Sequence, residues 1–316
     1  MNVLVTGAGL VGCNVARILM ERGHRAVLFD RSPNRAYIAS VAKDCPLAVG
    51  DVQDLSALIE TIQNHKVDVI VHTAYLIGDS LSQRPYAGVR ANVDGCLALV
   101  EAARLTGVKK FIFASTFGVY NWDLVPRAPQ LAPISEDHPL AGDIFYLASK
   151  IASEKLLIAF AKEYRIEFVI LRFAQIYGRG HYLGGDYAGI AIHEAVASAL
   201  AGKPVKLDPG IVTINDHVYA KDVAMGVVCA CEKPLKRNTY NIGSGQLSTP
   251  AEVSAAISSA VPDAKIEILP KPVIGPFWVH EQILDLGRVR EDLGYVPQYS
   301  VAKGIADFAS ELKAQS

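Results

Sequence analysis

The 316-residue sequence predicts an α/β fold, in which a doubly wound parallel sheet is covered by helices on both faces. Its strand candidates are short and apolar throughout, as expected of strands that are buried on both sides. Segments with the periodicity of amphipathic helices separate these strands. A glycine-rich turn, GAGLVG at residues 7–12, follows the first strand. Because ligands of such sheets bind beyond the carboxyl ends of the strands, residues at strand ends are candidate site residues.

The first unit is predicted to contain a strand at residues 3–6, a helix, and a second strand at residues 27–30. Between strand and helix, Gly7, Gly9 and Gly12 form a G-x-G-x-x-G pattern. The first glycine allows a tight turn, the second lets the backbone approach a pyrophosphate, and the third allows close packing of the helix. The N-terminus of that helix would face the negative charge. The unit therefore predicts dinucleotide binding rather than a purely structural turn.

The acidic residue at the end of the second strand indicates which dinucleotide is bound. Asp30 can accept hydrogen bonds from both hydroxyls of the adenosine ribose, and its charge would repel the extra phosphate of NADP. Arg31 and Arg35 could pair with that phosphate instead, or could belong to a solvated turn. The sequence favours NAD, with NADP the less favoured cofactor.

The alternation continues along the chain. Further strands are predicted at residues 46–51, 67–74, 109–116 and 167–174, and helices at residues 55–65, 88–106 and 144–164. The parallel order predicts that Gly7, Asp30, Asp51, Thr73 and Thr116 converge on one crevice. Asp51 could accept from the adenine amino group or cap the following helix, for which Asp54 is the stronger candidate.

A tyrosine and a lysine on one predicted helix indicate a proton-transfer site. Tyr146 and Lys150 are four residues apart, so both project from the same helix face. The same spacing recurs at Tyr299 and Lys303, so spacing alone is not evidence. Only the first pair follows a strand that delivers a hydroxyl, that of Thr116, and the second pair is predicted to lie on a surface helix.

Two polar residues have a structural interpretation beside a functional one. His72 is predicted to be a packed strand histidine rather than a catalyst. Asn92 lies within a predicted helix, where asparagine is a mediocre helix former, so it is expected either to make a buried backbone contact or to lie on the surface.

The composition favours a protein with a large core and a small-molecule partner. The length fits one large domain or two closely joined ones. With 31 basic and 32 acidic residues and no run of like charge, neither nucleic acid nor a membrane is an expected partner. No apolar run approaches the roughly 20 residues that span a bilayer, and the chain opens on a strand, so a cytoplasmic protein is expected. The five cysteines predict buried thiols, and no metal site is predicted.

With these motifs in view, the chain resembles the extended short-chain dehydrogenase/reductase superfamily, in its NAD-dependent epimerase/dehydratase branch. The resemblance covers nearly the whole length and rests on VTGAGLVG, GDVQD, HTA, NVDG, STFGVYN, YLASK, LRFAQIYGRG, VYAKDVA and YNIGSG. It implies a Rossmann-type NAD-binding domain of residues 1–174 plus about 211–245. The remainder, about 175–210 plus 246–316, would form a smaller C-terminal substrate lobe.

The resemblance also implies a catalytic triad of Thr116, Tyr146 and Lys150, with Asn92 holding the architecture of the site. Lys150 and the positive nicotinamide would lower the pKa of the Tyr146 phenol, ordinarily about 10, so that it exchanges a proton with a substrate hydroxyl. The residues implied to contact the cofactor are Gly7, Gly9, Leu10, Val11, Gly12, Asp30, Arg31, Asp51, Val52, Thr73, Ala74, Tyr146, Lys150 and Phe173.

Three departures from the family pattern bear on the substrate. The glycine loop is one residue shorter than is usual in the family. Phe117 and Gly118 stand where 4,6-dehydratases carry an acidic pair, so elimination of that kind is not expected. Asn215 stands where nucleotide-sugar epimerases usually place an arginine, and residues 271–282 contain no arginine, which weakens binding of a diphosphate. Possible anion contacts that remain are Arg172, Arg179 and Lys203.

Aromatic and polar residues beyond the strand ends could line the substrate pocket or belong to the core. They are Tyr75, Phe117, Gln175, Tyr177, His181 and Tyr182. The helix at residues 144–164 is apolar on more than one face, and in this family a homodimer covers such a helix.

The expected function is that of an NAD-dependent oxidoreductase, either a dehydrogenase or an epimerase that re-reduces its substrate. It would act on a secondary alcohol or ketone of a sugar, a sugar acid or a small hydroxy compound. The alternatives are a nucleotide-sugar epimerase with retained NAD and, from another class, a non-catalytic NAD-binding regulator.

Overall fold

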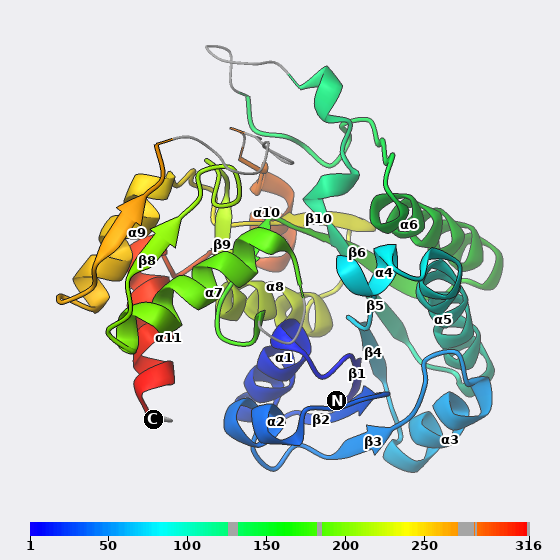
Figure 1. The fold of residues 1–316 in the computed structure, drawn as a ribbon. Coiled ribbons are helices and arrows are strands. Elements are labelled where there is room, and N and C mark those ends of the chain that lie inside the picture. The colour runs from blue at the N-terminus through cyan, green and yellow to red at the C-terminus, as the bar shows by residue number, and fades with distance from the viewer. Residues whose placement is uncertain (126–131, 182–184, 271–280, 282, 315–316) are drawn as a thin grey trace.

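A seven-stranded sheet, parallel throughout, forms the centre of the computed structural model, which describes residues 1–125, 132–181, 185–270, 281 and 283–314 (Figure 1). The strand order is β10-β6-β5-β4-β1-β2-β3. The strands are β1 (Asn2–Thr6), β2 (Arg25–Asp30), β3 (Leu47–Val49), β4 (Val69–His72), β5 (Lys110–Thr116), β6 (Glu167–Phe173) and β10 (Thr239–Ile242). The order runs outward in both directions from β1 and β4, so the predicted doubly wound Rossmann-type fold is confirmed.

Helices cover both faces of this sheet, because alternate side chains of each buried strand point to opposite sides. Val3 and Val5 of β1 pack in the cluster that includes residues of α1 (Leu10–Glu21) and α8 (Ala220–Glu232). Leu4 packs in the opposite cluster, with residues of α3 (Leu55–His65), α5 (Pro85–Thr106) and α6 (Phe145–Tyr164). Figure 1 shows α5 and α6 on the opposite side of the strands from α1 and α8.

The helix boundaries follow from local chemistry. The α3 helix has the predicted bounds, and the Asp54 side chain caps it by accepting from the Ala57 amide at 3.0 Å. The α5 helix begins three residues before the predicted start, at Pro85, because proline is tolerated in the first helical turn. The β3 strand is shorter than predicted, so Asp51 lies beyond its end.

A smaller lobe with its own apolar cluster lies beside the sheet (Figure 1). Its elements are β7 (Gln175–Tyr177), α7 (Tyr187–Leu200), β8 (Val205–Leu207), β9 (His217–Tyr219), α9 (Pro250–Ala260), β11 (Ile266–Ile268) and α11 (Val301–Lys313). β7 pairs with β9, and β8 pairs with β11. The domain boundaries proposed from the sequence stay a prediction.

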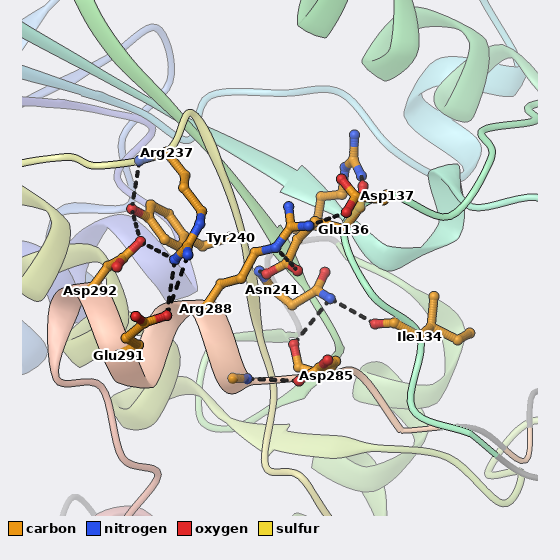
Figure 2. Close-up of polar contacts among 12 residues, drawn as sticks. Ile134, Glu136, Asp137, Arg237, Tyr240, Asn241, Asp285, Arg288, Glu291 and Asp292 are labelled. Carbon is orange, nitrogen blue, oxygen red and sulfur yellow. Dashed lines mark hydrogen bonds and ion pairs between the residues drawn. The ribbon is translucent and has the colours of Figure 1, made fainter.

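A polar network joins the edge strand β10 to α10 (Gly287–Leu293), as Figure 2 shows. The Asn241 side chain donates to the carbonyls of Ile134 and Asp285 at 2.9 and 3.2 Å. Its backbone amide donates to the buried carboxylate of Glu136, and the guanidinium of Arg288 lies 3.3 Å from that carboxylate. Burial raises the pKa of Glu136. The network holds the segment after residue 131 against the sheet edge.

The thiols are placed as the sequence predicted. Cys13, Cys45, Cys96 and Cys231 are buried, Cys229 is half-buried, and all five are free. Burial raises the pKa of Cys96 to about 12, so this thiol is unreactive at neutral pH. Within the described ranges, no helix combines the length and the apolar character needed to cross a bilayer.

Candidate active site

A cavity of about 1010 Å³ opens at the carboxyl ends of the strands. It runs from the glycine turn after β1, past the ends of β2, β4 and β5, to the loop before α7. Every candidate catalytic, cofactor and substrate residue in the described part of the chain lines it, with the single exception of Tyr177. The convergence of strand ends that the sequence predicted is therefore present in the structure.

The glycine turn has the shape that a pyrophosphate requires. Gly7 has a φ of +89°, which favours glycine. A Cβ on Gly12 would lie 1.8 Å from the Gly7 carbonyl oxygen, whereas a Cβ on Gly9 would meet no atom within 4 Å. Gly9 is the N-cap of α1 and provides no side-chain cap, so the helix N-terminus stays open toward the cavity. These residues fit a dinucleotide, with Gly9 leaving space for the phosphates.

The carboxylate of Asp30 is held in place at the adenosine end of the cavity. It accepts from the Ala8 amide at 2.8 Å and from the Ser32 amide at 2.7 Å. The Arg31 guanidinium lies 3.3 Å from the Asp51 carboxylate, and both side chains are exposed. Arg31 thus already has an anionic partner, which agrees with the preference for NAD over NADP.

Tyr146 stands at the start of α6, opposite the end of β5. Its pKa lies well above its ordinary value because burial raises it, while the charges of Tyr75 and Asp186 add to the increase and a hydrogen bond with Thr116 lowers it. The Thr116 hydroxyl also accepts from the Gly118 amide at 3.2 Å. The phenol and the hydroxyl therefore lie within contact of one another at one wall of the cavity.

Lys150 is buried, and its ammonium group lies nearer to the Tyr75 ring than to the Tyr146 ring. Its Nζ donates to the Ala114 carbonyl at 2.5 Å and lies 3.5 Å from the centroid of the Tyr75 ring, but 5.9 Å from that of Tyr146. Burial lowers the pKa of Lys150 to about 7. The ammonium group interacts with the Ala114 carbonyl and the Tyr75 ring. The expectation that Lys150, together with the positive nicotinamide, lowers the pKa of Tyr146 stays a prediction.

Asn92 and Tyr75 fix the loop after β4. The Asn92 side chain accepts from the Leu76 amide at 2.7 Å and donates to the Leu76 carbonyl at 3.0 Å. Asn92 is buried, so its interpretation as a backbone contact is confirmed. The Tyr75 hydroxyl bonds to Ser153 at 3.1 Å, and its ring meets that of Tyr146 edge-on.

His72 is a structural residue, as predicted. It is buried in β4, and one ring nitrogen bonds to the Thr6 hydroxyl at 2.8 Å. Burial lowers its pKa to about 3, so it is neutral. Tyr299 and Lys303, the other pair with the Tyr-to-Lys spacing, do not line the cavity.

The placement of Tyr177 in the substrate pocket is corrected. Tyr177 is fully buried in the core of the smaller lobe, where its ring lies 5.3 Å from that of Tyr219. Gln175 and Ile176 line the cavity, whereas the Tyr177 hydroxyl reaches α11 and donates to the Val301 carbonyl at 3.5 Å. Tyr182 lies outside the described residues.

The three possible anion contacts also lie away from the cavity lining. Arg172 is buried and paired with Glu154, with a nitrogen–oxygen distance of 2.7 Å. Arg179 is buried and donates to the hydroxyl of Ser40. Lys203 is exposed in the turn after α7. Arg172 and Arg179 are therefore engaged by partners outside the cavity, whereas Lys203 faces solvent.

Among the charged residues of the described cavity lining, the sequence analysis missed Asp186. Asp186 caps α7 by accepting from the Gly189 amide at 2.8 Å, and it also accepts from the side chain of Gln175. It lines the cavity near Tyr146. The available signal was its position before a helix, which indicated a cap and gave no reason to expect a second role.

A parallel sheet, a glycine turn and a Tyr–Lys pair around one cavity define a dinucleotide-dependent enzyme of the short-chain dehydrogenase/reductase type. Residues 3–243 match the NAD dependent epimerase/dehydratase family, and the chain belongs to that family. The predicted family, its enzymatic character and its use of NAD are thereby confirmed.

Individual relatives extend over the whole chain. A UDP-glucose 4-epimerase of Mycolicibacterium smegmatis is 31% identical over 313 residues, which cover 97% of this chain and 96% of the relative. The structure of a Thermotoga maritima UDP-glucose 4-epimerase with UDP-glucose superposes with a TM-score of 0.85 at 26% identity, covering 100% of this chain and 99% of that one. The structure of a Thermus thermophilus UDP-glucose 4-epimerase in complex with NAD superposes with a TM-score of 0.84 at 27% identity, covering 100% of both chains.

Proposed function

We propose that this protein interconverts a secondary alcohol and a ketone on a sugar-like substrate, with NAD as the hydride carrier. The observation that carries the proposal is the common cavity of the glycine turn, Thr116 and Tyr146. The proton-transfer pair Thr116 and Tyr146 therefore lines the same cavity as the glycine turn that would bind the dinucleotide.

In this proposal, Tyr146 exchanges the proton and Thr116 holds the substrate oxygen. When bound, NAD would be held by the glycine turn and Asp30 and would supply the hydride acceptor and donor for the same carbon. Because burial raises the pKa of Tyr146, the phenol is protonated at neutral pH and is ready to donate in the reducing direction. It accepts a proton in the oxidising direction only when positive charge nearby lowers that pKa.

Lys150 and Asn92 act in support of this pair. Lys150, with a pKa lowered to about 7 by burial, is partly charged at neutral pH and is the cation nearest to Tyr146 along α6. Asn92 holds the Leu76 backbone and so fixes the loop that carries Tyr75. Loss of either side chain should reduce turnover without removing the phenol itself.

The charge of the cavity supports a substrate smaller than a nucleotide sugar. Among the described lining residues, Arg31 and Lys150 are the only arginine and lysine, at the adenosine end and beside Tyr75. Asn215, at the position where an arginine would meet a diphosphate, is buried, and its backbone pairs with that of Ser248. A neutral sugar or other polyol needs no such arginine, whereas a diphosphate would lack its best partner.

A nucleotide-sugar epimerase with retained NAD is the second candidate. The names of the relatives, UDP-glucose 4-epimerases over almost the full chain, favour it. Both candidates use the same Tyr146 chemistry, and they differ in whether reduced cofactor leaves the enzyme.

The test compares UDP-galactose and UDP-glucose with neutral sugars and polyols, and measures free NADH and epimeric product together. We expect NADH from a neutral substrate and a Tyr146→Phe variant with at least roughly 100-fold lower turnover, since general acid–base catalysis contributes about that much or more. Tyr299→Phe is the matched control and should retain activity.

Turnover of a UDP-sugar without free NADH would establish the epimerase instead. If Tyr146→Phe retained every activity of the protein, the remaining alternative, a non-catalytic NAD-binding regulator, would replace both.

We further propose that α6 is covered by a second copy of the chain. Phe145, Leu156 and Ile158 on this helix are exposed apolar side chains, which a homodimer would bury. An Ile158→Glu variant should then sediment as a monomer, and a wild-type monomer at micromolar concentration would contradict the proposal. The cytoplasmic location stays a prediction.

A further inference from the structure

We propose that Asp186, oriented by Gln175, is a specificity-determining residue that selects substrates with a neutral or cationic hydrogen-bond donor and rejects anionic ones. The inference rests on the proposed function and names the substrate class of the same cavity. Asp186 lies in the cavity lining and was not among the residues predicted from the sequence.

Asp186 lines the same cavity as Thr116 and Tyr146. Gln175 begins β7, two residues after the end of β6, and α7 begins directly after Asp186. Both residues line the cavity. One carboxylate oxygen, Oδ1, accepts both from the Gly189 amide and from the Gln175 side chain. The charge of Asp186 also contributes to the raised pKa of Tyr146.

One oxygen of this carboxylate is available for a ligand. Both hydrogen bonds from described residues go to Oδ1, so Oδ2 has no donor within the described part of the chain. Asp186 is half-buried, with surface on the cavity. A substrate hydroxyl or ammonium can therefore donate to Oδ2 while Oδ1 stays occupied with the helix cap.

The surroundings leave the negative charge of Asp186 unneutralised. Two imidazoles, of His181 and His217, lie within its electrostatic influence. Burial lowers the pKa of His181 and lowers that of His217 to about 4, so both rings are neutral at neutral pH. Arg31 and Lys150, the arginine and lysine of the described lining, have partners of their own at Asp51 and Ala114.

A fixed anion in the lining of the substrate cavity discriminates by charge. A neutral polyol offers hydroxyl donors to Oδ2, and an ammonium group offers a charge-assisted bond. A carboxylate or phosphate in the same place has no donor to offer and is repelled. The cavity lacks an arginine for a diphosphate within its described lining, and Asp186 would select the substrate by charge instead.

The test uses the NAD-loaded protein with three probes of similar ring structure: galactose, galactosamine and galacturonate. Binding is measured by calorimetry, and NADH formation is followed in parallel. The wild-type protein should bind galactose and galactosamine roughly tenfold or more tightly than galacturonate, as expected of one charged hydrogen-bonding group. In Asp186→Asn this preference should disappear, with unchanged NAD affinity.

Asp186→Asn is suited to the test because asparagine is as good an N-cap as aspartate, so α7 should stay intact. Asp79→Asn is the matched control: Asp79 accepts from the Tyr187 hydroxyl at 3.1 Å close to the cavity, but does not line it. This control should keep the wild-type preference. The preference of the wild-type protein among the three probes can be measured without any variant.

Several outcomes would overturn the inference. These are equal or tighter binding of galacturonate by the wild-type protein, an unchanged preference in Asp186→Asn, or binding of none of the probes by a protein that binds NAD. A charge preference that depends on Asp186 without NADH from any probe would uphold the subsite and reject the proposed oxidation.

Discussion

Replacing Arg172 by methionine should destabilise the protein strongly. Arg172 in β6 and Glu154 in α6 form an ion pair with nitrogen–oxygen distances of 2.7 and 3.2 Å, and their side chains are only 6% and 1% exposed. Methionine would leave the Glu154 carboxylate buried with the Ser115 hydroxyl as its remaining donor, 2.5 Å away. Removing one partner of a buried pair costs about 3–5 kcal/mol.

The expected loss can be measured by urea denaturation and by thermal unfolding. For a chain of this size, a loss of 1 kcal/mol lowers the midpoint by about 2 °C, so Arg172→Met should lower it by roughly 6–10 °C. The guanidinium also lies 4.9 Å from the Tyr120 ring centroid and donates to the Glu136 carbonyl at 3.0 Å, so the loss should fall toward the upper end.

A surface pair and a double variant complete the experiment. Glu101 and Arg104 are as close, at 2.6 Å, but are 30% and 36% exposed, so Arg104→Met should cost less than about 1 kcal/mol. Glu154→Leu combined with Arg172→Met removes both charges and should recover much of the loss. The reasoning is refuted if Arg172→Met costs no more than the surface variant, or if the double variant loses the sum of both single losses.

Four further substitutions test the cofactor site and Lys150. Asp30→Asn should weaken NAD binding roughly tenfold and reduce discrimination against NADP, measured by parallel titrations, because a charged acceptor is lost; equal loss for both cofactors would contradict this. Gly9→Ala should leave the melting temperature unchanged but weaken NAD binding, whereas Gly12→Ala should destabilise the fold, because only the second Cβ meets the backbone, at 1.8 Å. Burial lowers the pKa of Lys150 from 10.5 to about 7, so the unfolded chain binds more protons between these values and stability rises with pH there. In Lys150→Met this rise of the free energy of unfolding should be absent. The prediction is contradicted if urea denaturation shows the same pH dependence from pH 7 to 10 for the variant and the wild-type protein.

The sequence predicted best the features that local chemistry determines. Apolar strands of a parallel sheet, the glycine turn and the Asp54 cap all depend on residues close together in the chain, and each was found as predicted. The direction of Lys150 could not be predicted, because it depends on Ala114 and Tyr75, which come from other elements. The periodicity of a helix predicts which side chains lie on the same face, but not which atoms the terminal group of a side chain contacts.

Charged residues in the second half of the site were harder to interpret, since their partners are distant in the sequence. Arg172 looked like an anion contact until Glu154, 18 positions earlier, was found to pair with it. Asp186 was not singled out in the sequence, where a position before a helix indicates only a cap. A carboxylate has two oxygens, however, and capping α7 uses only Oδ1. A structural role for such a residue therefore leaves room for a functional one, and only the cavity beside Asp186 indicates that both are present.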